Sequence, residues 1–317
     1  MGQVQPPASP QVIIYHAGSL SGAFNSLAEA FAKKTGIELV LRGFGSLDAA
    51  KRASIGKESV DIYASADYSN IDAFLKPIYA DYTIQFAVGG VVLAYTTDSK
   101  GAASIADPNG PAYNPPASVP NAAANWYTVL LADGVKIGGF DPNTDPGGYR
   151  VFHIMQLAQR LYGTAALYDN LRKKYSITTA GQRLGTDFDY QFPYEHSARS
   201  TAKTNERYRY VRLPAAVGLS DPAHAKVYRQ ASFDVAGFAP GDPPKPILGT
   251  RVTFGLTILK NAPHPNEALA FLQFMFSSEG IELQKPSGPD PIKPVVSADD
   301  FKRLPRSLQS LVGIERR

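Results

Sequence analysis

Three serines stand where a short apolar segment gives way to a helix-like one. Ser19 lies in the run His-Ala-Gly-Ser-Leu, Ser46 follows a glycine, and Ser65 opens the run Ser-Ala-Asp-Tyr. If each apolar segment is a strand of a parallel sheet, these turns lie at the carboxyl ends of the strands, where such sheets bind ligands. Hydroxyl groups and the first N–H groups of helices donate hydrogen bonds, and the helix dipole favours negative charge there. The pattern predicts a neutral cage for a small anion.

Ser19 taken alone is explained better by an ordinary structural role. It stands where the first residue of a helix would be capped, and serine is among the preferred capping residues. The recurrence of the same arrangement at Ser46 and Ser65 changes this balance. Three serine turns at one sheet edge favour anion binding over three unrelated caps.

Asp145 is a further residue whose side chain could bind a ligand. It precedes Pro146, which is the usual order of an N-cap and a first helical residue, so capping is the favoured interpretation from the residues alone. The alternative is a bond to the central atom of an oxyanion, because a carboxylate otherwise repels an anion. Molybdenum and tungsten can expand beyond four ligands, whereas sulfur and phosphorus in sulfate and phosphate do not. Asp145 is therefore a candidate ligand for the metal of molybdate or tungstate.

Enzyme chemistry finds little support in the sequence. The five histidines show no zinc-site spacing, and neither a G-x-S-x-G elbow nor a phosphate-binding P-loop occurs. His16 could act as a base beside Ser19, but a histidine at a strand end is more often packed. Asp187 and Asp189 could hold a cation, but such a pair is more often a solvated turn. A hydrolase is the weaker alternative, and we expect no enzyme activity.

The elements that would position these residues alternate between strands and helices. We expect strands over residues 12–15, 38–42, 60–64 and 252–259, and helices over 19–34, from about 46, and over 149–162 and 265–284. This alternation predicts an α/β fold with parallel-rich sheets flanked by helices. Residues 101–121 are rich in Pro, Ala, Asn and Gly and predict a surface loop.

The amino-acid composition excludes several classes of chemistry and partner. The 317 residues include 44% hydrophobic and 19% charged residues, as in globular proteins, and no cysteine, which excludes disulfides and thiol catalysis. The net charge of +4 is mild, and its densest cluster (Arg207, Arg209 and Arg212) alternates with aromatic and apolar residues. This alternation is typical of a strand face, so we expect no nucleic-acid partner. No apolar run is long enough to span a bilayer, and the first ten residues do not form an intact signal peptide.

Several motifs in order resemble the tungstate- and molybdate-binding proteins of ABC importers, in particular their long archaeal-type branch. They are HAGSL at 16–20, the Gly-Ser turn at Ser46, SADY at 65–68, YADY at 79–82, VLAYT at 92–96, DPN at 141–143 and DPGGYR at 145–150. GLTI at 255–258, NAPHP at 261–265 and FLQFMFSSEG at 271–280 are also similar. The resemblance covers nearly the whole chain.

The resemblance implies a two-lobed periplasmic-binding-protein type II fold, with the anion in a cleft between the lobes. We expect residues 1–97 and 248–317 in lobe one and residues 98–247 in lobe two. It further implies that Ser19 and Ser46 donate hydrogen bonds to the oxyanion and that Asp145 binds its metal. Ser65, Gly147 and Tyr149 are further candidates for contact with the oxyanion. No cofactor is expected beside the molybdate or tungstate ligand.

The same resemblance implies a monomer that is periplasmic or extracellular, associated with the membrane, and delivers its ligand to an ABC transporter permease. One position departs from the family pattern. Ala216, in Leu-Pro-Ala-Ala-Val-Gly-Leu-Ser-Asp-Pro, stands where the family has a second, glutamate ligand, and Glu195 is the nearest substitute in sequence. This departure keeps another anion, such as sulfate, phosphate or an organic anion, as an alternative.

Overall fold

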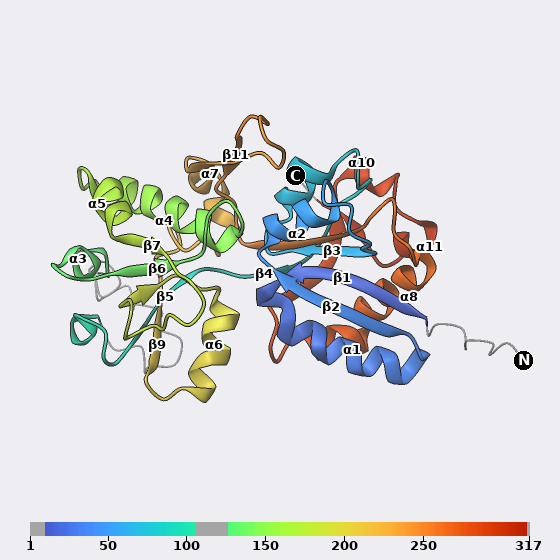
Figure 1. The fold of residues 1–317 in the computed structure, drawn as a ribbon, viewed down its shortest axis with the longest axis horizontal. Coiled ribbons are helices and arrows are strands. Elements are labelled where there is room, and N and C mark those ends of the chain that lie inside the picture. Colours follow the sequence, from blue (N-terminus) through green and yellow to red (C-terminus); the bar gives the residue numbers. More distant parts are fainter. Residues whose placement is uncertain (1–9, 106–125, 316–317) are drawn as a thin grey trace, which may run out of the picture. The chain divides into compact units, whose positions relative to one another are not determined.

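The computed structural model describes residues 10–105 and 126–315, and the chain divides into two compact units (Figure 1). Unit 1 comprises Met1–Ala87 and Phe254–Arg317, and unit 2 comprises Val88–Thr253. The boundaries therefore fall at residues 87 and 253 instead of the expected 97 and 247. The main reason is strand β5 (Val92–Thr96), which pairs with two strands of the unit 2 sheet and so belongs to that unit.

Unit 1 is built on a seven-stranded sheet in the order β14-β13-β4-β12-β3-β1-β2. Strand β1 (Gln11–Ala17) runs parallel to both β2 (Glu38–Phe44) and β3 (Ile62–Ser65), which confirms the predicted parallel units. Strand β12 (Thr253–Ile258) instead runs antiparallel to β3, so the sheet is mixed. The other strands are β4 (Ile84–Val88), β13 (Asp290–Val296) and β14 (Gly313–Ile314).

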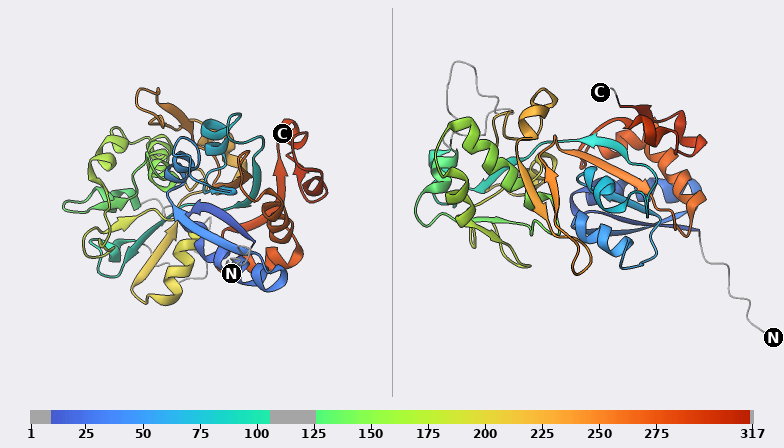
Figure 2. Two further views of the ribbon diagram at one scale, coloured as in Figure 1. Left: turned by 45° about the vertical axis from the view of Figure 1, so that its right-hand side comes forward. Right: turned by 90° about the horizontal axis from the view of Figure 1, so that it is seen from above.

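Helices flank this sheet (Figures 1 and 2). Helix α1 (Ser21–Thr35) packs against β2, α8 (Pro265–Met275) packs against β1, and α2 (Ser46–Ala53) packs against β1 and β3. The apolar stripe of α1 contacts α8 through Phe31, whose ring lies 5.4 Å from that of Phe271. The helical spacing of apolar residues in the sequence therefore corresponds to a buried face.

The predicted helix over residues 265–284 is wrong in one respect, because two helices occupy it. After α8, the chain turns and α9 (Ser278–Gln284) begins, with the Ser277 hydroxyl accepting a hydrogen bond from the Gly280 N–H at 3.2 Å. A Cβ at Gly280 would lie 2.2 Å from the Phe274 carbonyl oxygen, so this turn requires glycine. A serine cap and a glycine thus interrupt an otherwise continuous amphipathic pattern.

Unit 2 has a five-stranded sheet in the order β7-β6-β8-β5-β9. Its strands besides β5 are β6 (Ile137–Gly139), β7 (Tyr175–Ile177), β8 (Tyr190–Gln191) and β9 (Tyr208–Arg212), with β10 (Ser232–Val235) and β11 (Lys245–Leu248) as a separate antiparallel pair. The helices are α3 (Trp126–Leu131), α4 (Pro146–Tyr162), α5 (Leu167–Lys174), α6 (Glu195–Thr204) and α7 (Ala225–Tyr228). Helix α4 is buried along most of its length and lies in the core of the unit.

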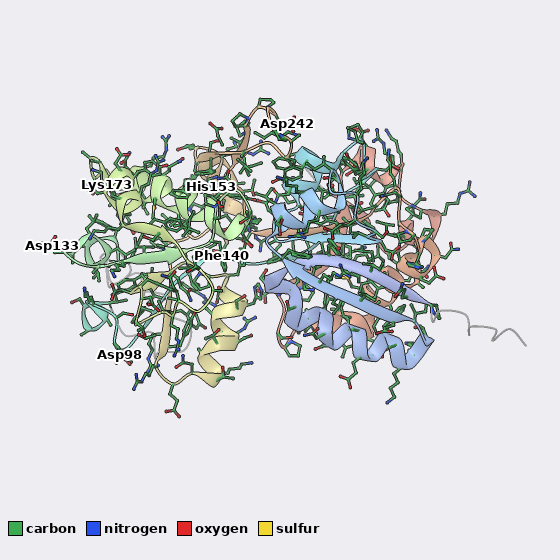
Figure 3. The ribbon with its side chains drawn as sticks, in the orientation of Figure 1. Asp98, Asp133, Phe140, His153, Lys173 and Asp242 are labelled. Atoms are coloured by element: carbon green, nitrogen blue, oxygen red, sulfur yellow. The ribbon has the colours of Figure 1, made fainter. Side chains whose placement is uncertain are left out.

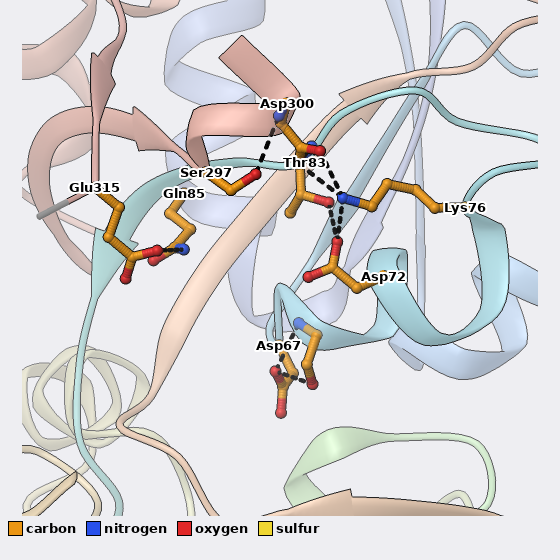
Figure 4. Close-up of polar contacts among 9 residues, drawn as sticks. Asp67, Asp72, Lys76, Thr83, Gln85, Ser297, Asp300 and Glu315 are labelled. Carbon is orange, nitrogen blue, oxygen red and sulfur yellow. Dashed lines mark hydrogen bonds and ion pairs between the residues drawn. The ribbon is translucent and has the colours of Figure 1, made fainter. Parts of the chain in front are cut away.

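The C-terminal segment is tied to unit 1 by a buried aspartate (Figure 4). Asp300, in helix α10 (Ala298–Phe301), is 5% exposed and accepts hydrogen bonds from the Lys76 Nζ at 2.7 Å and the Thr83 N–H at 2.9 Å. Lys76 also pairs with Asp72 at 2.7 Å. Helix α11 (Arg306–Gln309) then leads to β14 at the sheet edge. These contacts attach the end of the chain to the sheet that carries the serine turns.

Most of the predicted loop at 101–121 lies outside the described residues. A short 3₁₀ turn at Ala102–Ser104 is its described part. None of the helices within residues 10–105 and 126–315 is long and apolar enough to cross a membrane.

Candidate functional site

The three serine turns of unit 1 lie side by side at one edge of the sheet. The register places Ala17 of β1 opposite Phe44 of β2, and His16 opposite Ala64 of β3, so the three strands end nearly level. Ser19, Ser46 and Ser65 follow or occupy these ends. The parallel order β3-β1-β2 therefore brings together residues that are up to 46 positions apart in the sequence.

Ser46 has the clearest capacity to bind a ligand. It is the first residue of α2, which no side chain caps, and it is fully buried. Its hydroxyl oxygen accepts a hydrogen bond from the Ala66 N–H at 3.1 Å, and its carbonyl accepts one from the Tyr63 hydroxyl at 2.7 Å. Within the described part of the chain this hydroxyl donates to no acceptor. Contact between this proton and an anion at the start of α2 stays a prediction.

Ser19 does not cap a helix. It lies inside the 3₁₀ turn η1 (Gly18–Leu20), α1 begins two residues later at Ser21, and neither element has a side-chain cap. The Ser19 hydroxyl oxygen is buried. The interpretation of Ser19 as the cap of its own helix is therefore wrong, because the tight turn displaces the helix start.

Ser65 uses its hydroxyl within its own turn. The hydroxyl donates to the Asp67 carbonyl at 2.6 Å and accepts from the Asp67 N–H at 3.0 Å. Asp67, labelled in Figure 4, in turn accepts hydrogen bonds from the N–H and the hydroxyl of Ser69 at 3.0 and 2.8 Å. These bonds hold Ala66 where its N–H reaches Ser46. Sequence reasoning missed Ala66 and Asp67, although the run Ser-Ala-Asp has the pattern of a side-chain-stabilised turn.

Asp145 caps α4 in unit 2. Its Oδ1 accepts a hydrogen bond from the Gly147 N–H at 2.6 Å, and Pro146 is the first helical residue, which confirms the capping interpretation. Its other carboxylate oxygen accepts no hydrogen bond from residues 10–105 or 126–315. Capping therefore uses one oxygen and leaves the second for another partner.

The environment of Asp145 disfavours its charged form. Burial raises the pKa of Asp145 to about 6, although the hydrogen bond from Gly147 and the positive charge of Arg150 lower it. Arg150 is buried and donates to the Tyr194 hydroxyl at 2.8 Å. The charged form of a buried carboxylate is stabilised when a positively charged centre binds it.

This pKa predicts how the stability of the ligand-free protein responds to pH. Because the folded-state pKa exceeds the usual value of 3.8, the folded state holds a proton that the unfolded state loses, and this contribution disappears as the pH rises through about 6. Asparagine caps a helix but does not titrate. As the pH rises from 4.5 to 7.5, the free energy of unfolding of Asp145→Asn should therefore increase by about 1–3 kcal/mol relative to that of wild type. Urea unfolding of both proteins at the two pH values measures this change. If the free energies of unfolding of variant and wild type differed by the same amount at both pH values, the burial of this carboxylate would be contradicted.

The residues after Asp145 hold the first turn of α4 tightly. A Cβ at Gly148 would lie 2.5 Å from the Phe140 carbonyl oxygen and 2.6 Å from the Pro142 nitrogen, so glycine is required there. Tyr149 is fully buried, with its ring 5.6 Å from that of His153. The Tyr149 ring thus packs in the core of unit 2, and contact of Tyr149 or Gly147 with an anion stays a prediction.

Ala216 and Glu195 both belong to unit 2. The loop around Ala216 is held by the Tyr228 hydroxyl, which donates to the Ala215 carbonyl. The Glu195 carboxylate accepts from the Arg212 Nε at 2.8 Å and from its Nη2 at 2.5 Å. Both contacts use the same oxygen, Oε1, so Glu195 as a replacement for a second carboxylate ligand stays a prediction.

The residues of the hydrolase alternative have structural partners. The Asp189 carboxylate accepts from the Lys100 and Lys136 N–H groups at 3.0 and 2.9 Å, and Asp187 accepts from the Arg183 N–H at 2.8 Å. His16 bonds the Ala17 carbonyl at 2.9 Å, and burial lowers its pKa. In the described ranges no three His, Cys, Asp or Glu side chains are grouped to hold a metal ion.

Two α/β units with helix N-termini at a sheet edge define a fold of the two-lobed periplasmic-binding class. Among solved structures, the sulfate-binding protein SubI from Mycobacterium tuberculosis matches with a TM-score of 0.58 at 12% identity, covering 96% of this chain and 94% of that chain. A periplasmic thiamin binding protein matches with a TM-score of 0.56 at 15% identity, covering 98% and 92%. At these identities the likeness concerns the fold, which confirms the predicted fold class.

The family model described as bacterial extracellular solute-binding protein matches residues 12–288, and the chain belongs to this family. A solute-binding protein from Petrotoga mobilis is 31% identical, over 95% of this chain and 90% of its own length. The molybdate/tungstate-binding protein WtpA from Pyrococcus abyssi is 29% identical, over 96% and 90%. The family and these relatives are named for binding solutes rather than for catalysis.

Proposed function

We propose that this chain is the extracytoplasmic binding protein of an ABC importer and that its solute is molybdate or tungstate. The observation that carries this proposal is the half-buried Asp145 carboxylate, of which one oxygen caps α4 and the other accepts no bond within the described ranges. Relatives from Pyrococcus abyssi and Thermococcus kodakarensis that are named molybdate/tungstate-binding proteins support the choice of solute at 29% and 28% identity.

The chemistry of the site discriminates among anions. A carboxylate near a dianion is repelled, and this repulsion is strong where water is excluded. The repulsion is overcome if the carboxylate oxygen bonds the central atom directly, which molybdenum and tungsten allow. Sulfate and phosphate would meet Asp145 only as a like charge, unless a shared proton neutralises it. Asp145 therefore favours metal oxyanions and disfavours sulfate.

Unit 1 offers hydrogen-bond donors for an oxyanion. Ser46 offers a buried hydroxyl proton at the uncapped start of α2, and Ser19 lies at the neighbouring turn. Fixed donors replace the water around the anion, so no catalytic step and no cofactor are needed. The Ser65 contacts assign it the supporting role of holding Ala66 against Ser46.

Charge distribution suits an anion-binding protein. Unit 2 contains 17 Lys and Arg against 13 Asp and Glu, whereas unit 1 contains 15 of each, so the net charge of +4 lies in unit 2. Positive potential raises the encounter rate with anions. We propose that the two units act as the lobes of the binding protein, which delivers its solute to a membrane permease outside the cytoplasm.

A second candidate is a different small anion. The observation that favours it is Ala216, which stands where the related family supplies a second carboxylate. With a single carboxylate, selectivity against sulfate or an organic anion depends on Asp145 alone.

Thermal unfolding with a panel of anions separates the candidates. Molybdate and tungstate at millimolar concentration should raise the melting temperature by about 5–10 °C, because a ligand that binds only the folded state stabilises it. Sulfate, phosphate and chloride at equal ionic strength serve as controls. Absence of a shift with both metal oxyanions, or an equal shift with sulfate, would reject the proposed solute.

A further inference from the structure

Phe140 is a large apolar residue that unit 2 leaves exposed beside Asp145. It follows β6 directly and is labelled in Figure 3. Its exposed fraction is 59%. A Cβ placed on Gly147 would lie 3.1 Å from the Phe140 ring edge and 3.0 Å from the Asp145 Oδ1. The phenyl ring and the carboxylate are therefore neighbours over the first turn of α4.

The backbone of Phe140 is held in place. Its carbonyl oxygen accepts a hydrogen bond from the Tyr175 hydroxyl at 2.5 Å and lies against Gly148, where a side chain would collide with it. The following residues are fixed by the Asp145 N–H, which donates to the Asp141 carbonyl at 3.0 Å. The ring is thus presented to solvent by an ordered turn, although burying a phenyl group would gain about 1.5–3 kcal/mol.

We propose that Phe140 is a water-excluding cover over the bond between Asp145 and the bound anion. This inference rests on the proposed function of Asp145. Release of the anion requires water to replace the carboxylate and the hydrogen-bond donors, and an apolar group beside the carboxylate hinders the entry of that water. The bulk of the side chain slows dissociation, whereas diffusion and charge govern association.

Two substitutions at Phe140 test the cover. In Phe140→Ala, release of labelled molybdate should be about 10-fold faster, with an association rate within about twofold of wild type. In Phe140→Leu, which keeps apolar bulk, release should stay within about threefold of wild type. Ile177→Ala is the matched control, because Ile177 is an apolar residue of the same unit that is 53% exposed on β7. It should release molybdate at the wild-type rate.

The measurement is rapid filtration of the loaded full-length protein after a chase with unlabelled molybdate, and melting temperatures check that each variant is folded. Release from Phe140→Ala at the wild-type rate would overturn the cover alone. Equal acceleration in the alanine and leucine variants would also overturn it, since apolar bulk would then have no effect. If wild type retains neither molybdate nor tungstate, the proposed function fails, and the cover over that bond fails with it.

Discussion

Asp145→Ala is expected to weaken molybdate binding by about 100-fold or more while leaving sulfate binding nearly unchanged or improved. Truncating one partner of a close charged contact costs about 2–5 kcal/mol, and about 1.4 kcal/mol corresponds to tenfold in affinity. Sulfate makes no bond to the carboxylate, so removal of the negative charge relieves repulsion instead. Titration calorimetry with both anions measures the two changes.

The capping role of Asp145 needs its own control. Alanine also removes the hydrogen bond to the Gly147 N–H and should lower the free energy of unfolding by about 1 kcal/mol. Asparagine caps helices as well as aspartate does, so Asp145→Asn separates the two roles. Both variants should lose molybdate affinity, and only the alanine variant should lose the cap. Equal losses for molybdate and sulfate, or wild-type affinity in Asp145→Asn, would leave Asp145 as a cap and no more.

Ser46→Ala is expected to weaken every oxyanion by about 10-fold or more, because a hydrogen bond to a charged group contributes about 1.5–3 kcal/mol. The loss should be similar for molybdate and tungstate, unlike the selective loss at Asp145. The substitution also removes the hydrogen bond that the Ala66 N–H donates to the Ser46 hydroxyl, which should lower the free energy of unfolding by about 0.5–1.5 kcal/mol. Calorimetry and urea unfolding together measure the two effects.

Ser54→Ala is the matched control for Ser46. Ser54 follows the same helix, is 3% exposed, and its hydroxyl donates to the Ala50 carbonyl at 2.6 Å. Removing that hydroxyl takes away a buried serine without touching the start of α2, so anion affinity should be unchanged. Loss of affinity in Ser54→Ala as large as in Ser46→Ala would show that the integrity of the helix, and not its first hydroxyl, determines binding.

Local sequence patterns were sufficient for the first strands and helices of unit 1 and for helix α4 of unit 2. Apolar runs marked β1, β2 and β3, and helical spacing marked α1 and α4, because burial of one face imposes a period on the chain. Errors occurred where a few residues override that period. The turn at Gly18–Leu20 delays α1, and Ser277 with Gly280 divides the helix predicted over residues 265–284. In both cases hydrogen bonds of single residues decide, and periodicity does not reveal them.

The sequence did not reveal which sheet strand β5 joins. Its sequence reads as a buried strand, but nothing local states which sheet it joins. Its pairing with β8 and β9 depends on residues about 100 positions away, and that pairing moved the boundary of unit 2. Long-range strand pairing is determined by the packing of the whole unit.

The candidate site divides in the same way. The residue types and their turns, Ser19, Ser46 and Ser65 at strand ends and Asp145 before Pro146, follow from the sequence by itself, because capping and turn formation are local. Only the tertiary structure decided how their polar atoms are used. The Ser46 hydroxyl accepts a hydrogen bond and donates none within the described residues, whereas the Ser65 hydroxyl donates to the Asp67 carbonyl. Asp145 is buried, which raises its pKa. Burial and most hydrogen-bond partners depend on residues that are distant in the chain.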